Sequence, residues 1–290
     1  MARVSDLLAA GRTCSFEFFP PKTDSAQLSL GRTIAELEPL APSFVSVTYG
    51  AGGSSRARTR EVVTWVRKET SITPMAHLTC QGHARAEIAQ ILADYRAAGI
   101  ENILALGGDL PGDPADHGPS DYTYASELIA DIAGEEFAIG VAAHPEVHPR
   151  SPDRATDRRM LAAKLAAADF AITQFFFEVE HYVRLVDELA ALGVDKPVVP
   201  GIMPVTNAGQ IKRMAELSGA AVPSWLLDRL DGVDDIEEVR RIGVDVASAL
   251  CAELLDRGAP GLHLYTLNRS TASREIYANL GLGASRAAAE

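Results

Sequence analysis

Short runs of Val, Ile and Phe alternate along the chain with segments of helical period rich in Ala, Leu, Glu and Arg, and this alternation repeats eight times. Runs such as FVSVTY and NILAL are apolar on both faces, as parallel strands covered by helices should be. The predicted strands span residues 13–19, 43–48, 74–79, 101–106, 137–143, 170–176, 196–202 and 261–266. The predicted helices follow at 25–38, 57–69, 84–98, 122–133, 154–167, 179–192, 207–217 and 270–279, with an extra helical stretch at about 222–256.

Eight strands with eight crossovers is the count of a closed eight-stranded parallel β/α (TIM) barrel. The pattern therefore predicts an α/β fold of this kind, with the extra helical stretch before strand eight. The 290 residues are an ordinary length for one barrel and contain no Ser/Gly-rich linker, so we expect a single β/α-barrel catalytic domain over residues 1–290. The long polar loop at 111–120, after the fourth strand, is a candidate lid.

The formal net charge of −12, with no cluster of Lys and Arg, argues against binding to nucleic acid or a membrane surface. Residues 1–8 lack the features of a signal peptide, and no apolar run approaches the ~20 residues of a membrane span, so the expected location is the cytoplasm. The cysteines, Cys14, Cys80 and Cys251, lie outside any CxxC pattern and are expected to be reduced and packed.

Polar residues gather at the ends of the predicted strands, while the strand interiors stay apolar. In a β/α barrel the active site lies where strands end and loops begin, so these positions predict a pocket. In chain order they are Glu17, Thr48, Tyr49, His77, Thr79, Gly107, Gly108, Asp109, His144, Glu146, His148, Gln174, Tyr265, Asn268 and Arg269.

Glu17 is the most informative of these residues, because it follows Phe16 and precedes Phe18 and Phe19. Burying a carboxylate costs several kcal/mol unless it is paired or held neutral. Two interpretations are open: Glu17 is the acid of an active site, or it is a strand-end carboxylate paired with a Lys or Arg.

Metal and nucleophile chemistry find less support. His77, His144, Glu146 and His148 are a candidate metal set, but HxH and HExxH spacings are absent, so no metal site is predicted. Neither a GxSxG elbow nor a paired Cys/His segment is present to supply a nucleophile.

A phosphate-binding turn is a further candidate. Gly107, Gly108 and Asp109 follow the fourth strand, near the helix opened by Tyr124 and Ala125, and a helix N-terminus can bind phosphate. A lone GGD is equally compatible with a tight turn. Lys164, the one Lys of the fifth crossover, either meets an anionic group or is solvated.

Eight segments in this order resemble the methylenetetrahydrofolate reductases of bacteria and the catalytic domain of the eukaryotic ones. They are SFEFFPPK, FVSVTYGAGG, HLTC, GDLPGD, VAAHPEVHP, ITQFFF, PGIMPV and HLYTLNRS, spread from residue 15 to residue 270. The resemblance implies a β/α barrel that reduces 5,10-methylenetetrahydrofolate to 5-methyltetrahydrofolate. It also implies NADH or NADPH as the electron source, and FAD as the hydride carrier in most members.

The resemblance assigns roles to individual residues. Glu17 matches the acid that protonates the bridging nitrogen as the folate ring opens to an iminium, a role served by a raised pKa. Asp109 matches a carboxylate beside the flavin and pterin that stabilises this cation, and Gln174 matches an amide that contacts folate and nicotinamide. The implied cofactor-binding positions are Thr48, His77, Gly108, Asp109, Tyr124, Ala125, His144, His148, Asp157 and Lys164, and the implied substrate-binding positions are Gln174, Tyr265 and Arg269.

Three departures from the family pattern fall on the flavin side. Gly107 stands where the family usually has an arginine, so a cation beside the flavin is missing. His144 stands where an aromatic residue, commonly Tyr, is usual, and the segment between Lys164 and ITQFFF is one residue shorter. Two routes are therefore open: FAD carries the hydride, or FAD binding is weak or lost and NADH delivers its hydride directly to the iminium.

Two other functions stay open. A proline-dehydrogenase-like flavoenzyme would need an arginine pair for its substrate carboxylate, and only Arg269 is evident. A non-catalytic folate-binding or accessory homologue would be favoured by a cysteine cluster or a docking extension, and neither is present. The sequence leaves the choice between NADH and NADPH open, as well as the oligomeric state.

Overall fold

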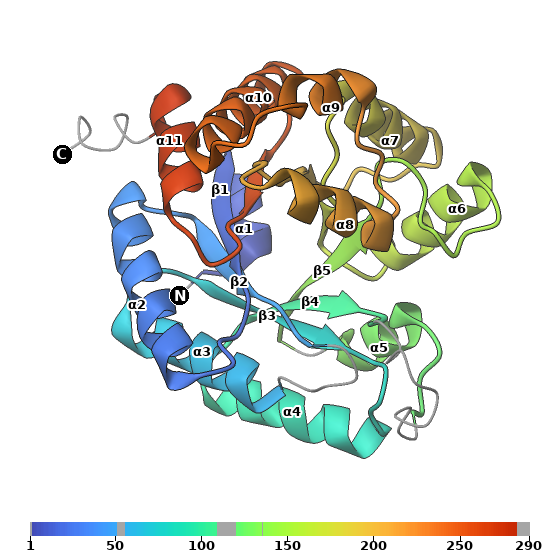
Figure 1. Ribbon diagram of the computed structural model, residues 1–290. Helices are drawn as coiled ribbons and strands as arrows, with labels where there is room; N and C mark the ends of the chain where they lie inside the picture. The colour runs from blue at the N-terminus through green and yellow to red at the C-terminus, as the bar shows by residue number, and fades with distance from the viewer. Residues whose placement is uncertain (1, 51–55, 109–119, 135, 283–290) are drawn as a thin grey trace.

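A computed structural model describes residues 2–50, 56–108, 120–134 and 136–282, and shows parallel strands ringed by helices (Figure 1). The strands are β1 (Thr13–Phe18), β2 (Phe44–Val47), β3 (Pro74–Thr79), β4 (Asn102–Leu106), β5 (Ala138–Ala143), β6 (Phe170–Thr173), β7 (Val198–Val199), β8 (Gly201–Ile202) and β9 (Gly261–Tyr265). The helices are α1 (Val4–Ala10), α2 (Asp24–Leu37), η1 (Glu38–Leu40), α3 (Arg56–Glu69), α4 (Arg85–Ala97), α5 (Ala125–Ile132), α6 (Arg154–Leu165), α7 (Val179–Ala191), α8 (Ala208–Ser218), α9 (Ser224–Leu230), α10 (Ile236–Asp256) and α11 (Thr271–Asn279). Asp109 and residues 111–119 of the predicted lid lie outside the described residues.

The predicted seventh strand is two short strands separated by Pro200. β7 pairs with β6, and β8 pairs with β9, so the two halves join opposite edges of the sheet. Pro200 has no N–H to donate, but its carbonyl accepts a hydrogen bond from the His263 amide at 3.0 Å. The closed parallel β/α barrel is therefore confirmed, with the seventh strand interrupted at one residue.

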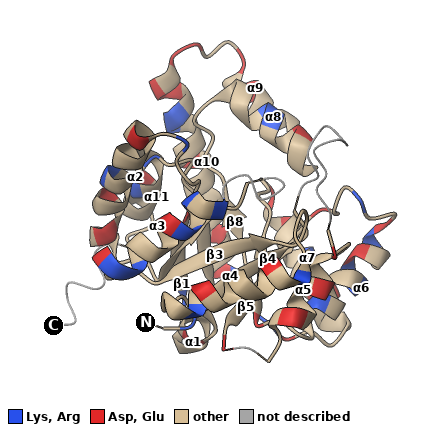
Figure 2. Ribbon diagram, turned by 90° about the horizontal axis from the view of Figure 1, so that it is seen from below, with Lys and Arg blue, Asp and Glu red and all other residues tan. Residues whose placement is uncertain are grey.

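The interior of the barrel is closed at its amino end by α1, a helix that the sequence pattern did not predict. Val4 and Leu8 of α1 pack against interior side chains that include Phe44 and Phe170. The Val4 amide also donates to Asn102 Oδ1 at 2.7 Å, which ties α1 to β4. Figures 1 and 2 show α8 at the other end of the barrel, where the strands end and an active site is expected.

Successive side chains of β1 point to opposite faces of the sheet, one toward the outer apolar core and the other toward the barrel interior. Phe16 and Phe18 belong to the apolar layer between strands and helices, and the Phe16 ring lies 5.3 Å from that of Tyr277 on α11. Ser15 and Glu17 have the opposite parity and face the interior. The phenylalanines around Glu17 in the sequence therefore line a different face of the sheet.

The predicted extra helical stretch forms two helices, α9 and α10, before β9. Leu226 and Val239 from these helices pack with Phe175, Met203 and Ile211 in an apolar cluster of their own. This cluster supports the carboxyl end of the barrel beneath α8. Among the described residues, no helix is long and apolar enough to cross a membrane.

Candidate active site

Three neighbours from three strands surround the carboxylate of Glu17 at the end of β1, where the side chain is buried. Oε2 of Glu17 lies 3.3 Å from Nε2 of His77 on β3 and 3.5 Å from Nε2 of His263 on β9. Ser46 on β2 donates its hydroxyl to the same oxygen at 3.3 Å. Among the described residues, no Lys or Arg is paired with Glu17. The partners of this strand-end carboxylate are two imidazoles instead of the Lys or Arg that the second interpretation expected.

The imidazoles set the protonation of Glu17. Burial raises the pKa of its carboxyl, but the hydrogen bond to His263 and the interactions with His77 outweigh burial and lower the pKa to about 2. The expected raised pKa is therefore wrong. The expectation placed the carboxylate among phenylalanines, whereas Phe16 and Phe18 point to the other face and two histidines distant in sequence face Glu17.

The loop after β9 holds the end of β1 in place. Thr266 Oγ1 donates to the Glu17 carbonyl at 2.6 Å. The Asn268 side chain accepts from the Phe19 amide at 2.8 Å and donates to the Phe19 carbonyl at 2.9 Å. Leu267 and Asn268 both have positive φ, at 52° and 59°, and this left-handed pair turns the Asn268 side chain back onto β1. The position of Glu17 is thus fixed from both β1 and β9.

Tyr265, a predicted substrate-binding residue, has its hydroxyl engaged within the barrel. It donates to the Thr173 carbonyl at 2.6 Å, and burial with the charge of Glu17 raises the pKa of Tyr265 well above 10. A Cβ on Gly201 would lie 2.6 Å from this hydroxyl, so the ring requires glycine at that position. Tyr265 therefore remains a neutral side chain in the wall beside Glu17.

Four predicted cofactor positions gather at the end of β5. The rings of His144 and His148 are 4.4 Å apart, edge to face, and the His148 amide donates to Asp157 at 3.2 Å. Lys164 donates to the Ala142 carbonyl of β5 at 2.9 Å, and burial lowers the pKa of its ammonium. Burial, followed by repulsion from His148, lowers the pKa of His144 to about 3, so this ring is neutral.

Arg158 organises this region and was missed in the sequence. Its guanidinium is buried, pairs with Asp157 at 2.5 Å, and donates to the carbonyls of His144, Pro145 and Glu146 at 2.8–3.0 Å. These bonds hold the loop after β5 in one conformation. Its place in α6, after the polar run SPDRATD, resembled a solvated helix start, so the sequence contained no signal for its burial.

The remaining predicted cofactor positions are spread over three strand ends. Thr48 follows β2, and its carbonyl accepts from Thr59 Oγ1 at 2.8 Å. Tyr124 is exposed and precedes Ala125 at the start of α5, where the Glu127 carboxylate already accepts from the Tyr124 amide at 2.9 Å. A phosphate at this helix start would meet that carboxylate.

Gly108 and Gly107 behave differently at the end of β4. Gly108 has φ of +90°, and a Cβ there would lie 2.9 Å from Thr79 Cβ, so only glycine fits. A Cβ on Gly107 would lie 3.6 Å from Nη2 of Arg150, an exposed residue in the loop after β5. The guanidinium of Arg150 thus lies close to Gly107, the position where the family usually has an arginine.

Gln174 and Arg269 flank the mouth of the barrel. Gln174 follows β6 directly, and its side-chain oxygen accepts from the Phe175 amide at 3.0 Å, which orients the amide group. Arg269 is exposed after β9 and forms no ion pair within the part of the chain that the structure describes. The described residues contain no group of three or more His, Cys, Asp or Glu with the geometry of a metal site.

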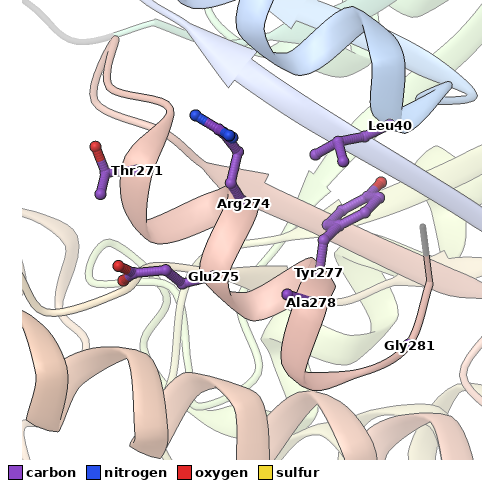
Figure 3. A pocket seen from close by; sticks show the side chains of 7 residues that line it. All are labelled: Leu40, Thr271, Arg274, Glu275, Tyr277, Ala278 and Gly281. Carbon is purple, nitrogen blue, oxygen red and sulfur yellow. The ribbon is translucent and has the colours of Figure 1, made fainter. Parts of the chain in front are cut away.

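A surface pocket of about 700 Å³ lies elsewhere, between η1 and α11 (Figure 3). Figure 3 shows Leu40, Arg274, Glu275 and Tyr277 among the side chains that line it. Because Tyr277 packs on the outward-facing Phe16, this pocket lies across the barrel wall from Glu17. It is separate from the candidate active site.

Comparison with known proteins shows the family of the chain. The family model for methylenetetrahydrofolate reductase matches residues 3–281. The chain belongs to this family. The 5,10-methylenetetrahydrofolate reductase of Escherichia coli (strain K12) is 40% identical over 273 residues, covering 92% of this chain and 90% of that protein. The same enzyme of Pectobacterium carotovorum is also 40% identical, over 271 residues.

Two more distant similarities were found, one in sequence and one in fold. Methylenetetrahydrofolate reductase 1 of Schizosaccharomyces pombe is 38% identical over 280 residues, and the chain spans 46% of its length. A solved protein from Clostridium thermocellum, described as binding two copies of 5-methyl-5,6,7,8-tetrahydrofolic acid, has a TM-score of 0.69 at 15% identity, covering 97% of both chains. The latter likeness shows the fold. Family membership makes the chain an enzyme, an oxidoreductase of the methylenetetrahydrofolate reductase class.

The described residues do not form a ready cradle for the phosphates of FAD. Asp157 and Lys164 are hydrogen-bonded within the chain, and the Glu127 carboxylate lies at the start of α5. The loop after β5 is instead a self-supporting structure built around Arg158.

Proposed function

We propose that this chain reduces 5,10-methylenetetrahydrofolate to 5-methyltetrahydrofolate, with Glu17 as the acid and a reduced nicotinamide as the direct hydride donor. The observation that carries the proposal is the buried carboxylate–imidazole cluster at the mouth of a barrel of this family. Each turnover consumes one proton and one hydride, and yields the methyl product and the oxidised nicotinamide.

The proton opens the folate ring. It passes from Glu17 to one of the two nitrogens that share the bridging carbon, as the bond from that nitrogen to the carbon breaks. The other nitrogen and the carbon form a cationic iminium, and the carboxylate left on Glu17 stabilises this cation by its charge. Addition of hydride to the iminium carbon then completes the methyl group.

Other predicted residues take supporting roles in this proposal. Gln174, at the end of β6, contacts folate and the nicotinamide through its oriented amide, and Arg269 contacts the folate at the mouth. Asp109, outside the described residues, is proposed as a second carboxylate beside the cation. Direct hydride transfer is favoured over the FAD route because the Glu127 carboxylate lies at the start of α5, where a phosphate would be repelled, and because Lys164 donates to the Ala142 carbonyl.

The test is NADH oxidation driven by methylenetetrahydrofolate, with protein shown by its visible spectrum to contain no flavin. The assay is run with and without added FAD, with NADPH in parallel, and with Glu17→Gln as the inactive control. Turnover without FAD that FAD does not increase supports the whole proposal. Turnover only with FAD overturns direct transfer, and no turnover in either case overturns the folate reaction for the isolated chain.

A further inference from the structure

His263 is a fully buried histidine inside the barrel wall, and the proposed reaction does not yet use it. It lies on β9 with 0% exposure, and its ring stacks on that of Phe44 at 5.8 Å. The titratable groups that face it are Glu17 on β1, His77 on β3 beyond the same carboxylate, and Tyr265 on β9, whose ring is 5.4 Å away. A buried imidazole is costly unless its nitrogens are bonded, and both nitrogens of His263 have neighbours.

The hydrogen bonds of Ser15 fix the tautomer of His263. The Ser15 hydroxyl donates to the Leu262 carbonyl at 3.2 Å, so its one hydrogen is used. Nδ1 of His263 lies 2.7 Å from the same oxygen, and with that hydrogen on the Leu262 carbonyl this arrangement favours Nδ1 as the donor, in the N–H form. The neutral ring then has its lone pair on Nε2.

Nε2 of His263 faces two oxygens that can exchange a proton with it. Oε2 of Glu17 is 3.5 Å away, and Oγ of Ser46 is 3.3 Å away. Ser46 Oγ is in turn 3.3 Å from Oε2 of Glu17, so the three groups form a closed triangle. With Nδ1–H bound to Ser15, a proton between Glu17 and His263 has one place on the ring, at Nε2.

We propose that His263 and Glu17 share one proton inside the barrel, with the tautomer of His263 held by Ser15, and that this shared proton is the one that opens the folate ring. The inference rests on the proposed function for its chemistry, but the sharing itself is a property of the protein alone. His263 acts through Glu17 and is a positioning residue.

The proton balance of a turnover follows from this arrangement. Before reaction the proton is on Nε2 of His263 and Glu17 is an anion. With folate bound, the proton moves from Nε2 to Oε2 and from Oε2 to the folate nitrogen, which leaves His263 neutral and Glu17 an anion beside the iminium. After product release the pair takes one proton from solvent through Glu17, the member of the pair with some exposure.

His77 is less suited to this role, although it also contacts Glu17. Its Nε2 lies 3.3 Å from Oε2 without forming a hydrogen bond. Among the described residues, no hydrogen bond fixes its tautomer, in contrast to the Ser15 bond of His263. His77 thus acts on the cluster by helping to lower the pKa of Glu17, and His263 contributes a defined proton position.

The first experiment compares His263→Gln with wild type and with His83→Gln, a control at another buried histidine that hydrogen-bonds Tyr49 outside the cluster. His263→Gln should lower kcat about 100-fold, leave the KM for folate within about twofold, and move the alkaline fall of kcat to lower pH. His83→Gln should change none of these. An unchanged pH profile in folded His263→Gln overturns the proposal.

The second experiment needs no turnover, so it separates failure of this inference from failure of the proposed function. Nitrogen NMR of histidine-labelled protein reports which ring nitrogen carries hydrogen, and the His263 signals are assigned by their absence in His263→Gln. The expected result is Nδ1–H in wild type and in Glu17→Gln, with a hydrogen shared at Nε2 in wild type but not in Glu17→Gln. Ser15→Ala should mix the two neutral tautomers. Nδ1 without hydrogen in wild type, or identical Nε2 signals in wild type and Glu17→Gln, overturns the proposal.

Discussion

Replacing Glu17 by Gln keeps the size of the side chain and removes the negative charge between two imidazoles. The carboxyl has a pKa of about 2 in the folded protein and an ordinary value of 4.5. A lowered pKa means that the carboxylate stabilises the fold fully above about pH 4.5. This contribution is lost as the pH falls from 4.5 through 2, because the unfolded chain takes up the proton first.

The size of the effect follows from the two pKa values. The difference, 4.5 − 2 = 2.5, corresponds to about 3 kcal/mol at 1.36 kcal/mol per pKa unit. Glu17 is only 9% exposed, so screening by solvent reduces this free energy only slightly. Glu17→Gln retains a partner for Ser46. We therefore expect this variant to have a free energy of unfolding about 1–3 kcal/mol lower than that of wild type at pH 7. About 1 kcal/mol of the carboxylate contribution disappears between pH 7 and pH 4.

Urea unfolding of wild type and Glu17→Gln at both pH values measures this difference, with Glu180→Gln, an exposed glutamate on α7, as the matched control. On going from pH 7 to pH 4, the free energy of unfolding of wild type and of the control should fall by about 1 kcal/mol more than that of Glu17→Gln. If Glu17→Gln loses as much as wild type, the two imidazoles do not hold the carboxylate in its charged form, and the assignment of the cluster is wrong.

Three further predictions concern the end of β4 and the loop after β5. Arg150 lies beside Gly107 and is predicted to contact the nicotinamide nucleotide, so Arg150→Ala should raise the KM for NADH about tenfold, the loss expected for one hydrogen bond to a charged group. Arg159→Ala, on the exposed face of α6, should leave this KM unchanged, and equal changes in steady-state kinetics would contradict the predicted contact. Gly108→Ala should lose about 1–3 kcal/mol in thermal unfolding because of its φ of +90°, whereas Gly107→Ala should stay near wild type, and equal losses would contradict the geometry. Asp157→Asn should lower the free energy of unfolding in urea by about 3–5 kcal/mol, since it takes one anionic partner from buried Arg158. A loss below about 1 kcal/mol would show that Glu188, 2.7 Å from Arg158, is sufficient to pair with the guanidinium.

The barrel itself could be predicted from periodicity, and its irregular parts could not. Each predicted strand has its counterpart with ends that differ by at most three residues, because apolar runs and helical period are local properties. The split at Pro200 depends on which neighbours each half of the strand pairs with, and α1 is too short, at seven residues, to show a period. Its burial comes from the hollow end of the barrel, which exists only after the strands have closed.

The candidate site shows the same division. Polar residues at strand ends indicated the mouth of the barrel, and Glu17, His77 and Tyr265 do meet there. His263 was overlooked because it lies within β9 rather than at its end. The alternation of side chains along the strand could have indicated it. Residues 263 and 265 lie on the same face of β9, and the register pairs Ser15 with His263.

The direction of the Glu17 pKa bears on what the site must contain to act as an acid. A carboxyl with a pKa of about 2 is protonated in only about one molecule in 10⁵ at pH 7. Such a group cannot by itself supply a proton at a useful rate, although it is well suited to stabilise a cation. Both tasks are compatible if the proton is kept on a neighbouring base and passes through the carboxylate only as the substrate nitrogen accepts it. The interior of this barrel provides such a base 3.5 Å away, buried and with its other nitrogen already bonded to Ser15. The lowered pKa, which contradicts the simple acid assignment for Glu17 alone, is thus the reason to assign the acid to Glu17 and His263 together.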